Sequence, residues 1–145
     1  MSKSSKAGSG KVTAGAKDRS VSTRFETGMT VRRAVLGDAH VDRSLASADD
    51  FSWPMQELTT EVGWGDIWAR PGLDRKSRSL VNLGMLTALN RPHELEVHIR
   101  GAVRNGCTPA EIREVLMQTA VYCGFPAALD AFRTARKVLQ EEGLI

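Results

Sequence analysis

The sequence predicts an all-α protein built as a single domain of about six helices. Apolar residues recur at helical spacing along most of the chain, helix start and stop signals divide it into short segments, and no stretch sustains the alternation typical of a strand. A length of 145 residues suits one domain with a substantial core. The hydrophobic fraction of 41% and the charged fraction of 26% are those of an ordinary globular protein.

The first 23 residues differ in composition from the rest of the chain. They are rich in Ser, Gly, Lys and Ala and offer little to bury, so we expect a disordered cationic tail followed by a folded domain over residues 24–145. The tail carries a net charge of +4, so residues 24–145 sum to about −1 of the chain's total of +3. The folded part is therefore not basic, and we expect no nucleic-acid partner.

The absence of targeting signals and the number of cysteines indicate where the protein is located. No apolar run reaches membrane-spanning length and the N-terminus lacks the hydrophobic core of a signal peptide, so we expect a cytoplasmic protein with no membrane partner. Cys107 and Cys123 are too few for a disulfide framework and are expected to be free thiols.

Three helices are expected in the first half of the domain. Arg24–Leu36 has helical periodicity, and the polar stretch 37–43 that follows is expected to be a loop or short turn. A second helix runs from a cap at Asp50 to about Trp68. The third, Asp74 to about Leu89, is apolar on most sides, which is typical of a helix buried centrally or at a subunit contact. The expected inward side of the second helix consists of Phe51, Met55, Leu58, Val62 and Ile67.

Three further helices are expected in the second half. Arg91–Asn105 is followed by Gly106, at the position where a left-handed residue ends a helix. Thr108–Glu111 reads Thr-Pro-Ala-Glu, a capping box with proline at the first helical position. The helix it begins stops at Gly124, and Pro126 begins the last one.

A histidine within the apolar stripe of Arg91–Asn105 is the first candidate for chemistry. His98 lies among Leu95, Ile99 and Ala102, and Glu94 lies four residues earlier, within hydrogen-bonding reach on the same face. The carboxylate favours a charged ring while burial opposes it, so we expect the pair to titrate near neutrality. The alternative interpretation is a core histidine without a catalytic role.

The spacing of other residues excludes several common sites. His93 and His98 are five apart, and Val97 occupies the position where the HExxH zinc motif needs its second histidine. The chain also has no GxGxxG after a strand, no Walker loop and no GxSxG elbow, so we expect no metal and no nucleotide. What remains suits cofactor-free acid–base chemistry on a small anion, with arginines near helix ends as its cations. These arginines are Arg32, Arg33, Arg70, Arg78, Arg91 and Arg100.

Four runs of sequence are distinctive: Arg24–Arg43, Trp64–Arg78, Ala88–Glu94 and Val121–Arg133. They closely resemble the carboxymuconolactone decarboxylase family, and the match covers essentially residues 24–139. The resemblance implies an all-α fold like that of alkyl hydroperoxidase D, and a homo-oligomer that is typically a hexamer, a trimer of dimers. It also implies cofactor-independent decarboxylation of 4-carboxymuconolactone to 3-oxoadipate enol-lactone in protocatechuate catabolism, the β-ketoadipate pathway.

The thiol peroxidases of the wider superfamily use a CxxC motif, a following histidine and an upstream glutamate. Laid on this chain, the histidine falls on His98, but Arg91 and Glu94 occupy the cysteine positions and the glutamate falls near Ser79. Peroxidase activity would therefore need Cys107 or Cys123 and remains an alternative, as does a helical oligomer that binds without catalysis.

The resemblance and the spacing together give a candidate site. His98 is the expected proton donor or enolate stabiliser, oriented by Glu94, and the resemblance adds His40 as a further catalytic candidate. Arg91 and Arg78 are the candidate clamps for a dianionic lactone, the first because it shares the face of His98 and the second because it opens the buried helix. Trp64 and Trp68, four residues apart, are candidates for a pocket wall, although core packing is the better explanation of their spacing.

Overall fold

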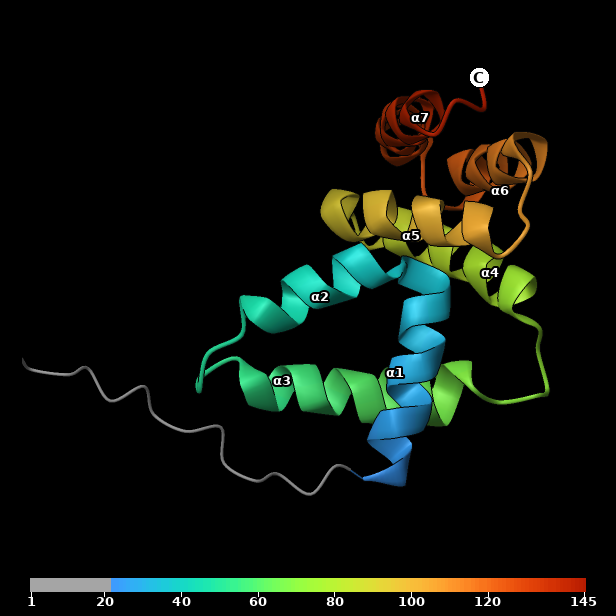
Figure 1. Ribbon diagram of the computed structural model, residues 1–145. Coiled ribbons are helices and arrows are strands. Elements are labelled where there is room, and N and C mark those ends of the chain that lie inside the picture. Colours follow the sequence, from blue (N-terminus) through green and yellow to red (C-terminus); the bar gives the residue numbers. More distant parts are fainter. Residues whose placement is uncertain (1–21) are drawn as a thin grey trace, which may run out of the picture.

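The computed structural model describes residues 22–145, and this part of the chain is all-helical, as predicted (Figure 1). The elements in chain order are α1 (Thr23–Leu36), α2 (Asp38–Ala46), α3 (Trp53–Leu58), the π-helix η1 (Thr59–Trp68), α4 (Arg75–Ala88), α5 (Pro92–Arg104), α6 (Pro109–Tyr122) and α7 (Phe125–Glu141). Most of the cationic tail expected over residues 1–23 lies outside the described residues, but Ser22 caps α1 and Thr23 begins it. None of the described helices is long and apolar enough to cross a membrane.

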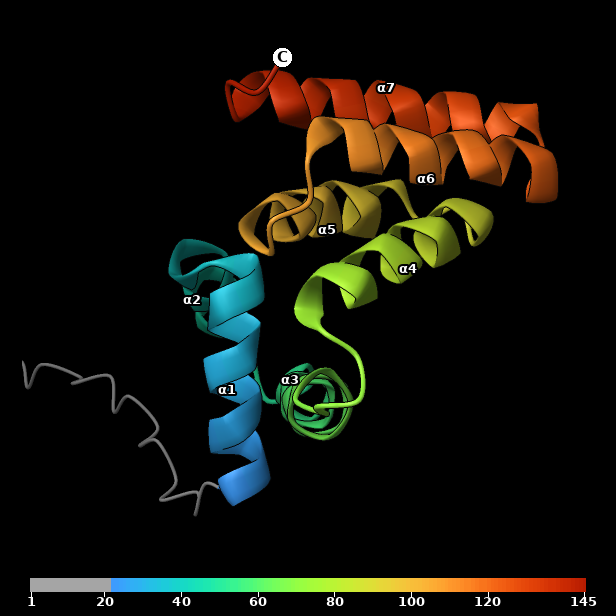
Figure 2. The same cartoon turned by 90° about the vertical axis from the view of Figure 1, so that its right-hand side faces the viewer.

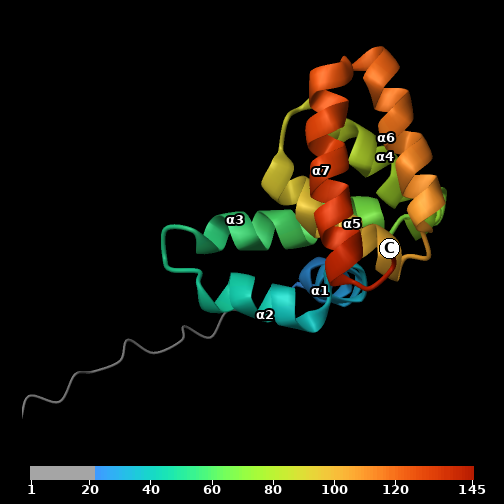
Figure 3. The same ribbon diagram turned by 90° about the horizontal axis from the view of Figure 1, so that it is seen from above.

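The helices form two groups that meet at α5. Helices α4 to α7 pack together as a bundle, and α1, α2 and α3 with η1 lie against one end of it (Figure 2). Seen from above, α2 and α3 extend on the side opposite α4 and α6 (Figure 3). Because α5 contacts α1, α4 and α7, its different faces look toward both groups.

Each group has its own apolar core. The bundle core includes Leu83, Ile99, Ile112, Leu116 and Val138, all inaccessible or nearly so. The second core joins α1, α2 and η1 to α5 and consists of Val31, Val35, Leu36, Val41 and Trp64, with Met29, Leu45, Trp68 and Val97 at its edge. The candidate histidine and tryptophan side chains belong to this second region.

Local capping chemistry explains most helix boundaries. Asp74 accepts from the backbone N–H of Ser77, and both halves of the Thr108–Glu111 capping box are present. Gly106 and Gly124 adopt φ values of 88° and 93°, a region that glycine enters without steric penalty. The predicted starts of α4, α6 and α7 are therefore confirmed to within one or two residues.

The stretch 37–43 is helical, so the expectation of a loop there was wrong. Gly37, at φ 84°, ends α1 and directly precedes α2. Arg33, in the last turn of α1, pairs with Asp38 and Asp42 of α2 and ties the two helices together. These pairs form across the bend at Gly37, which a count of apolar spacing does not detect.

The orientation of α3 and η1 also differs from the expectation. The five apolar residues assigned to the inward side, Phe51, Met55, Leu58, Val62 and Ile67, are all exposed in the single chain, and Thr60 and Trp64 are buried instead. The reason is the approach of α1: an ideal Cβ on Gly28 would lie 2.0 Å from the Thr60 carbonyl oxygen. Glycine at this position lets the backbones of α1 and η1 touch, and the touching face is the buried one.

Candidate active site

His98 lies on α5 against two indole rings of η1. Its ring centroid is 6.1 Å from that of Trp64 and 6.1 Å from that of Trp68, with interplanar angles of 11° and 24°. The two indoles are themselves 5.0 Å apart. The structure thus brings His98, Trp64 and Trp68 together, with both tryptophans on the same side of the π-helix, and none of the three lines the cavity beside His40.

The protonation of His98 differs from the expectation. Burial, and next the charge of His40, lower the pKa of His98 from 6.5 to about 4, while Glu94 raises it only weakly. The ring is therefore neutral at pH 7 rather than poised near its midpoint. Its Nδ1 is enclosed and has no hydrogen-bond partner.

Glu94 does not orient His98 in this structure. It is an exposed residue in the first turn of α5, and among residues 22–145 no hydrogen bond joins it to the imidazole. The shared helix face is real, but Glu94 lies at the solvent end of that face while His98 enters the second core. Spacing alone could not separate these two environments.

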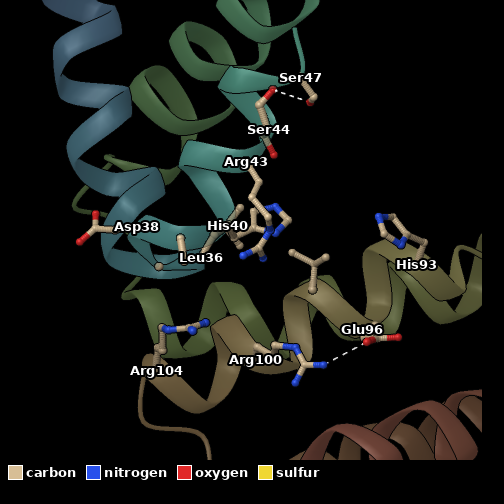
Figure 4. A pocket seen from close by; sticks show the side chains of 13 residues that line it. Leu36, Asp38, His40, Arg43, Ser44, Ser47, His93, Glu96, Arg100 and Arg104 are labelled. Atoms are coloured by element: carbon tan, nitrogen blue, oxygen red, sulfur yellow. Dashed lines mark hydrogen bonds and ion pairs between the residues drawn. The ribbon is translucent and has the colours of Figure 1, made fainter.

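His40 lines a cavity of about 680 Å³ between α2 and α5. Figure 4 shows His40 and Arg43 on α2, with His93 and Arg104 on α5 at opposite ends of the cavity. Burial lowers the pKa of His40, and the nearby positive charges of Arg32 and Arg43 lower it further. This cavity is the basic pocket.

The two carboxylates at the basic pocket are already neutralised. Asp38 pairs with Arg33 at 3.1 Å. Glu96 pairs with Arg100 at 3.0 Å and with Lys137 at 3.2 Å. Within residues 22–145, Arg43 and Arg104 have no ion-pair partner, so the pocket carries an excess of positive charge.

Arg104 is held at the joint between α1 and α2. An ideal Cβ on Gly37 would lie 3.1 Å from both the Cζ and Nη2 atoms of Arg104, so the guanidinium packs where a side chain would otherwise stand. Arg43 and Arg104 were not among the residues predicted from the sequence. A signal was present, because His93, Val97, Arg100 and Arg104 follow a spacing of four, three and four along one face of a helix.

Arg78 and Arg91, the two expected clamps, lie outside the basic pocket. Arg78 donates hydrogen bonds to the carbonyl oxygens of Leu73 and Arg70, both at 3.1 Å, and shares a small cavity of about 120 Å³ with Trp68. It fastens the loop before α4. Arg91 is exposed beside a depression of about 10 Å³ between α5 and α7.

Cys107 is poorly suited to thiol chemistry. Burial raises the pKa of the Cys107 thiol to about 11, and its Sγ contacts the Lys76 carbonyl oxygen at 3.7 Å. A thiol with a raised pKa holds few thiolate ions at neutral pH. Cys123 is a free thiol at the end of α6.

The fold and site define a helical protein with a basic, imidazole-lined pocket suited to a small anion. The chain belongs to the carboxymuconolactone decarboxylase family, whose model matches residues 54–137. The chain is 45% identical to a nitrosuccinic acid decarboxylase of Metarhizium robertsii over 117 residues, 81% of this chain and 82% of that one.

Two bacterial relatives are also named decarboxylases. A 4-carboxymuconolactone decarboxylase of Acinetobacter baylyi is 40% identical over 121 residues, 83% of this chain and 90% of that one. One of Pseudomonas putida is 56% identical over 43 residues, 30% of this chain and 90% of that one. The family and these relatives identify the class of enzyme as a decarboxylase, a carbon–carbon lyase.

Proposed function

We propose that this enzyme decarboxylates 4-carboxymuconolactone to 3-oxoadipate enol-lactone, a step of protocatechuate catabolism. The observation that carries the proposal is the basic pocket, in which Arg43 and Arg104 have no ion-pair partner among residues 22–145 and lie beside His40. The substrate is a lactone with two carboxylates, and a pocket with spare positive charge matches a dianion. The likeness to the Acinetobacter decarboxylase over most of its length supports the same assignment.

The reaction needs no external electron sink. When the bond between the γ-carbon and its carboxylate breaks, carbon dioxide leaves and the electron pair moves through the ring alkene onto the lactone carbonyl oxygen. The resulting dienolate then takes one proton on carbon. The substrate dianion and one proton thus give carbon dioxide and the product monoanion, and cofactors that supply a sink elsewhere are not required.

Residues of the basic pocket have distinct roles in this proposal. Arg43 and Arg104 hold the retained acetate arm, because both are accessible cations without a competing carboxylate. His40 lies beside them and is the candidate for delivering the proton, since a bound dianion raises the pKa of an adjacent imidazole. Arg78 and Arg91 are assigned no contact with the substrate.

His98 is assigned as a neutral hydrogen-bond donor to the developing enolate. A ring with a pKa of about 4 carries one N–H at neutral pH and donates without being an acid. Trp64 and Trp68 form the wall that holds the ring flat. Glu94, which is exposed, is left without a part in the chemistry.

A second substrate is favoured by the relative from Metarhizium robertsii, which is named for nitrosuccinic acid. This acid also carries two carboxylates, and loss of the one beside the nitro group leaves the electron pair on nitro oxygens. The two substrates share a dianionic charge and an oxygen that receives electrons as carbon dioxide leaves. The same pocket chemistry therefore serves either one.

The deciding experiment offers each acid to the purified full chain. Carbon dioxide release and, for the lactone, enol-lactone formation are followed together at neutral pH. We expect turnover of the lactone, with nitrosuccinic acid a slower substrate. Turnover of nitrosuccinic acid alone would reassign the substrate, and turnover of neither would refute the proposed function.

Assembly with further copies of the same chain is part of the proposal. Large apolar side chains are exposed along α3, η1, α4 and α6 in the single chain, and such a surface favours burial between subunits. We assign the covering partner as a second copy, within a hexamer arranged as a trimer of dimers. Cytoplasmic location and the lack of a nucleic-acid or membrane partner complete the proposed setting.

A further inference from the structure

Arg32, on α1, is a buried arginine without a counter-ion. Only 5% of its surface is exposed, and within residues 22–145 it has no ion-pair partner. Its hydrogen bond runs from Nη1 to the Thr60 hydroxyl oxygen at 3.1 Å, and its Nε is enclosed with no partner. Burial lowers the pKa of this guanidinium, and the neighbouring charge of Arg33 lowers it further.

The adjacent arginine shows how differently the chain can treat the same side chain. Arg33 is partly exposed and pairs with two carboxylates, Asp38 at 3.1 Å and Asp42 at 2.7 Å. A buried charge without a partner lowers stability, and replacement by an apolar side chain of similar size is often neutral or stabilising. Arg32 is therefore poorly explained as a stabilising residue and well explained as a group that awaits an anion.

The surroundings of Arg32 connect it to both candidate histidines. Thr60, its hydrogen-bond partner, lies one turn before Trp64 in η1, and Trp64 stacks on His98. His40 is close enough for Arg32 to lower its pKa. Arg32 is thus linked to the aromatic cluster through Thr60 and acts on His40 through its charge, although it is not among the residues that line the basic pocket.

Two polar atoms in this region remain available to a ligand. The Nη2 atom of Arg32 makes no hydrogen bond and, unlike Nε, is not fully enclosed. The same holds for Nε2 of His98, whose Nδ1 is the enclosed nitrogen. Each side chain therefore keeps one unused donor position at an accessible surface.

We propose that Arg32 binds the oxygen that becomes negatively charged as carbon dioxide leaves. This inference rests on the proposed function and adds to it a group that contacts the reacting atoms. The bond from carbon to the departing carboxylate breaks, and its electron pair is delocalised onto that oxygen. The resulting anion is then protonated on carbon. A partly desolvated cation aimed at the developing charge stabilises it more strongly than a solvated one does.

The arginines are expected to act at different stages of the reaction. Arg43 and Arg104 contact a carboxylate that is charged before and after the reaction, so they contribute to binding of substrate and transition state alike. Arg32 contacts an oxygen that gains its charge only in the transition state. Loss of Arg43 or Arg104 should therefore raise KM, whereas loss of Arg32 should lower kcat.

The test compares Arg32→Met with Arg113→Met, a change of the same kind on α6, outside the basic pocket. We expect Arg32→Met to lower kcat at least about 100-fold with little change in KM, while its melting temperature is equal to or above that of the wild type. Arg113→Met should keep kcat, because Arg113 is exposed on α6 and pairs with its neighbour Glu114. Arg32→Lys, which restores charge without the planar fork, should recover part of the rate.

A binding measurement separates this inference from the proposed function. Calorimetry would compare the preformed nitronate of 3-nitropropanoate, which mimics the developing oxyanion, with succinate, which lacks it. The wild type and Arg113→Met should prefer the nitronate, and Arg32→Met should lose that preference. If the wild type turns over neither acid but this pattern holds, the function fails and the Arg32 site stands. Wild-type kcat in a folded Arg32→Met, or an unchanged nitronate preference, would overturn the Arg32 site alone.

Discussion

At the scale of single residues, burial decides how the two candidate imidazoles behave. His98 lies against Trp64 and Trp68, and the loss of solvent there is the main reason for its low pKa. His40 faces the basic pocket and has its pKa lowered by burial and then by nearby arginines. Both rings are therefore neutral in the free enzyme at pH 7, and an arriving dianion meets arginine cations and neutral imidazoles.

His98 also links folding to pH in a defined direction. Its pKa is about 4 in the folded chain and 6.5 ordinarily, so between these values the unfolded chain binds more protons. The free energy of unfolding should fall as the pH is lowered from about 6.5 to about 4, by about 3 kcal/mol in total. Urea titrations of the wild type and of His98→Gln across this range measure the effect.

His98→Gln should lack this part of the pH dependence, whereas His93→Gln, a change at an exposed histidine, should retain it. In the same preparation, His98→Gln should lower turnover by about 100-fold, the range usual for such groups. Identical pH profiles for the wild type and His98→Gln would contradict the assigned burial. Unchanged turnover in a folded His98→Gln would remove this ring from the mechanism.

At the scale of elements, the contact between α1 and η1 sets the geometry of the site. The close approach at Gly28 fixes the position of Thr60, and the π-helix then carries Trp64 toward His98. Short π-helical segments commonly occur at functional sites, where an altered helical repeat redirects side chains. The aromatic cluster thus depends on a backbone contact that involves no candidate residue.

Gly28→Ala should separate these two helices. Its Cβ would lie 2.0 Å from the Thr60 carbonyl oxygen, which is backbone and cannot rotate away. We expect a loss of stability of about 2 kcal/mol or more, as for other overpacked sites, and a fall in turnover as Trp64 moves. Chemical denaturation and activity of the purified variant provide the measurement.

Gly63→Ala is the matched control on the partner element, because nothing lies within 4 Å of its ideal Cβ. It should be neutral or slightly stabilising, since alanine favours a helical backbone more than glycine does. Equal effects of the two substitutions would show that backbone entropy, and not the contact with Thr60, governs position 28.

The sequence predicted the elements of the bundle better than it predicted the site. The starts of α4 and α6 could be predicted because each cap residue and the residue it bonds are only three positions apart in the sequence. The orientation of η1 was not, since it depends on a glycine 32 positions before Thr60 in the sequence. His98 was found by its helical spacing, but its low pKa arises from indoles that only the folded chain brings to it.

The unpaired arginines of the site could not be predicted from local sequence patterns either. Arg32, Arg43 and Arg104 matter because they have no counter-ion in residues 22–145, and pairing is a property of three-dimensional neighbours. Arg78 and Arg91 were chosen for their places along helices, and the fold gives Arg78 backbone carbonyls to bind and leaves Arg91 exposed. Charge type can be read from a sequence, whereas charge balance requires the fold.

At the scale of the whole molecule, one chain leaves a large apolar surface uncovered. Val81 and Met85 of α4 are 54% and 51% exposed, and Tyr122 at the end of α6 is 81% exposed. Val81 and Tyr122 line a shallow groove of about 400 Å³ between α4 and α6. The proposed assembly buries this groove against another copy.

Val81→Glu should therefore disrupt the assembly. A carboxylate in a subunit contact loses its solvation without gaining a partner, which weakens association. Light scattering after size exclusion should show the mass fall toward the 15.8 kDa of one chain. Ala34→Glu, on the exposed side of α1, should leave the assembly intact. A wild type that is already monomeric would refute the proposed oligomer.

Gly37 is the whole connection between α1 and α2, so the length of the chain at this point determines how α2 is rotated. A helix turns through about 100° per residue, and α2 starts immediately after this single-residue joint. One extra amino acid inserted here would preserve the composition and the periodicity of both helices. It would nevertheless rotate His40 and Arg43 away from the face they share with α5, so the length of this connection is as much a part of the site as the side chains are.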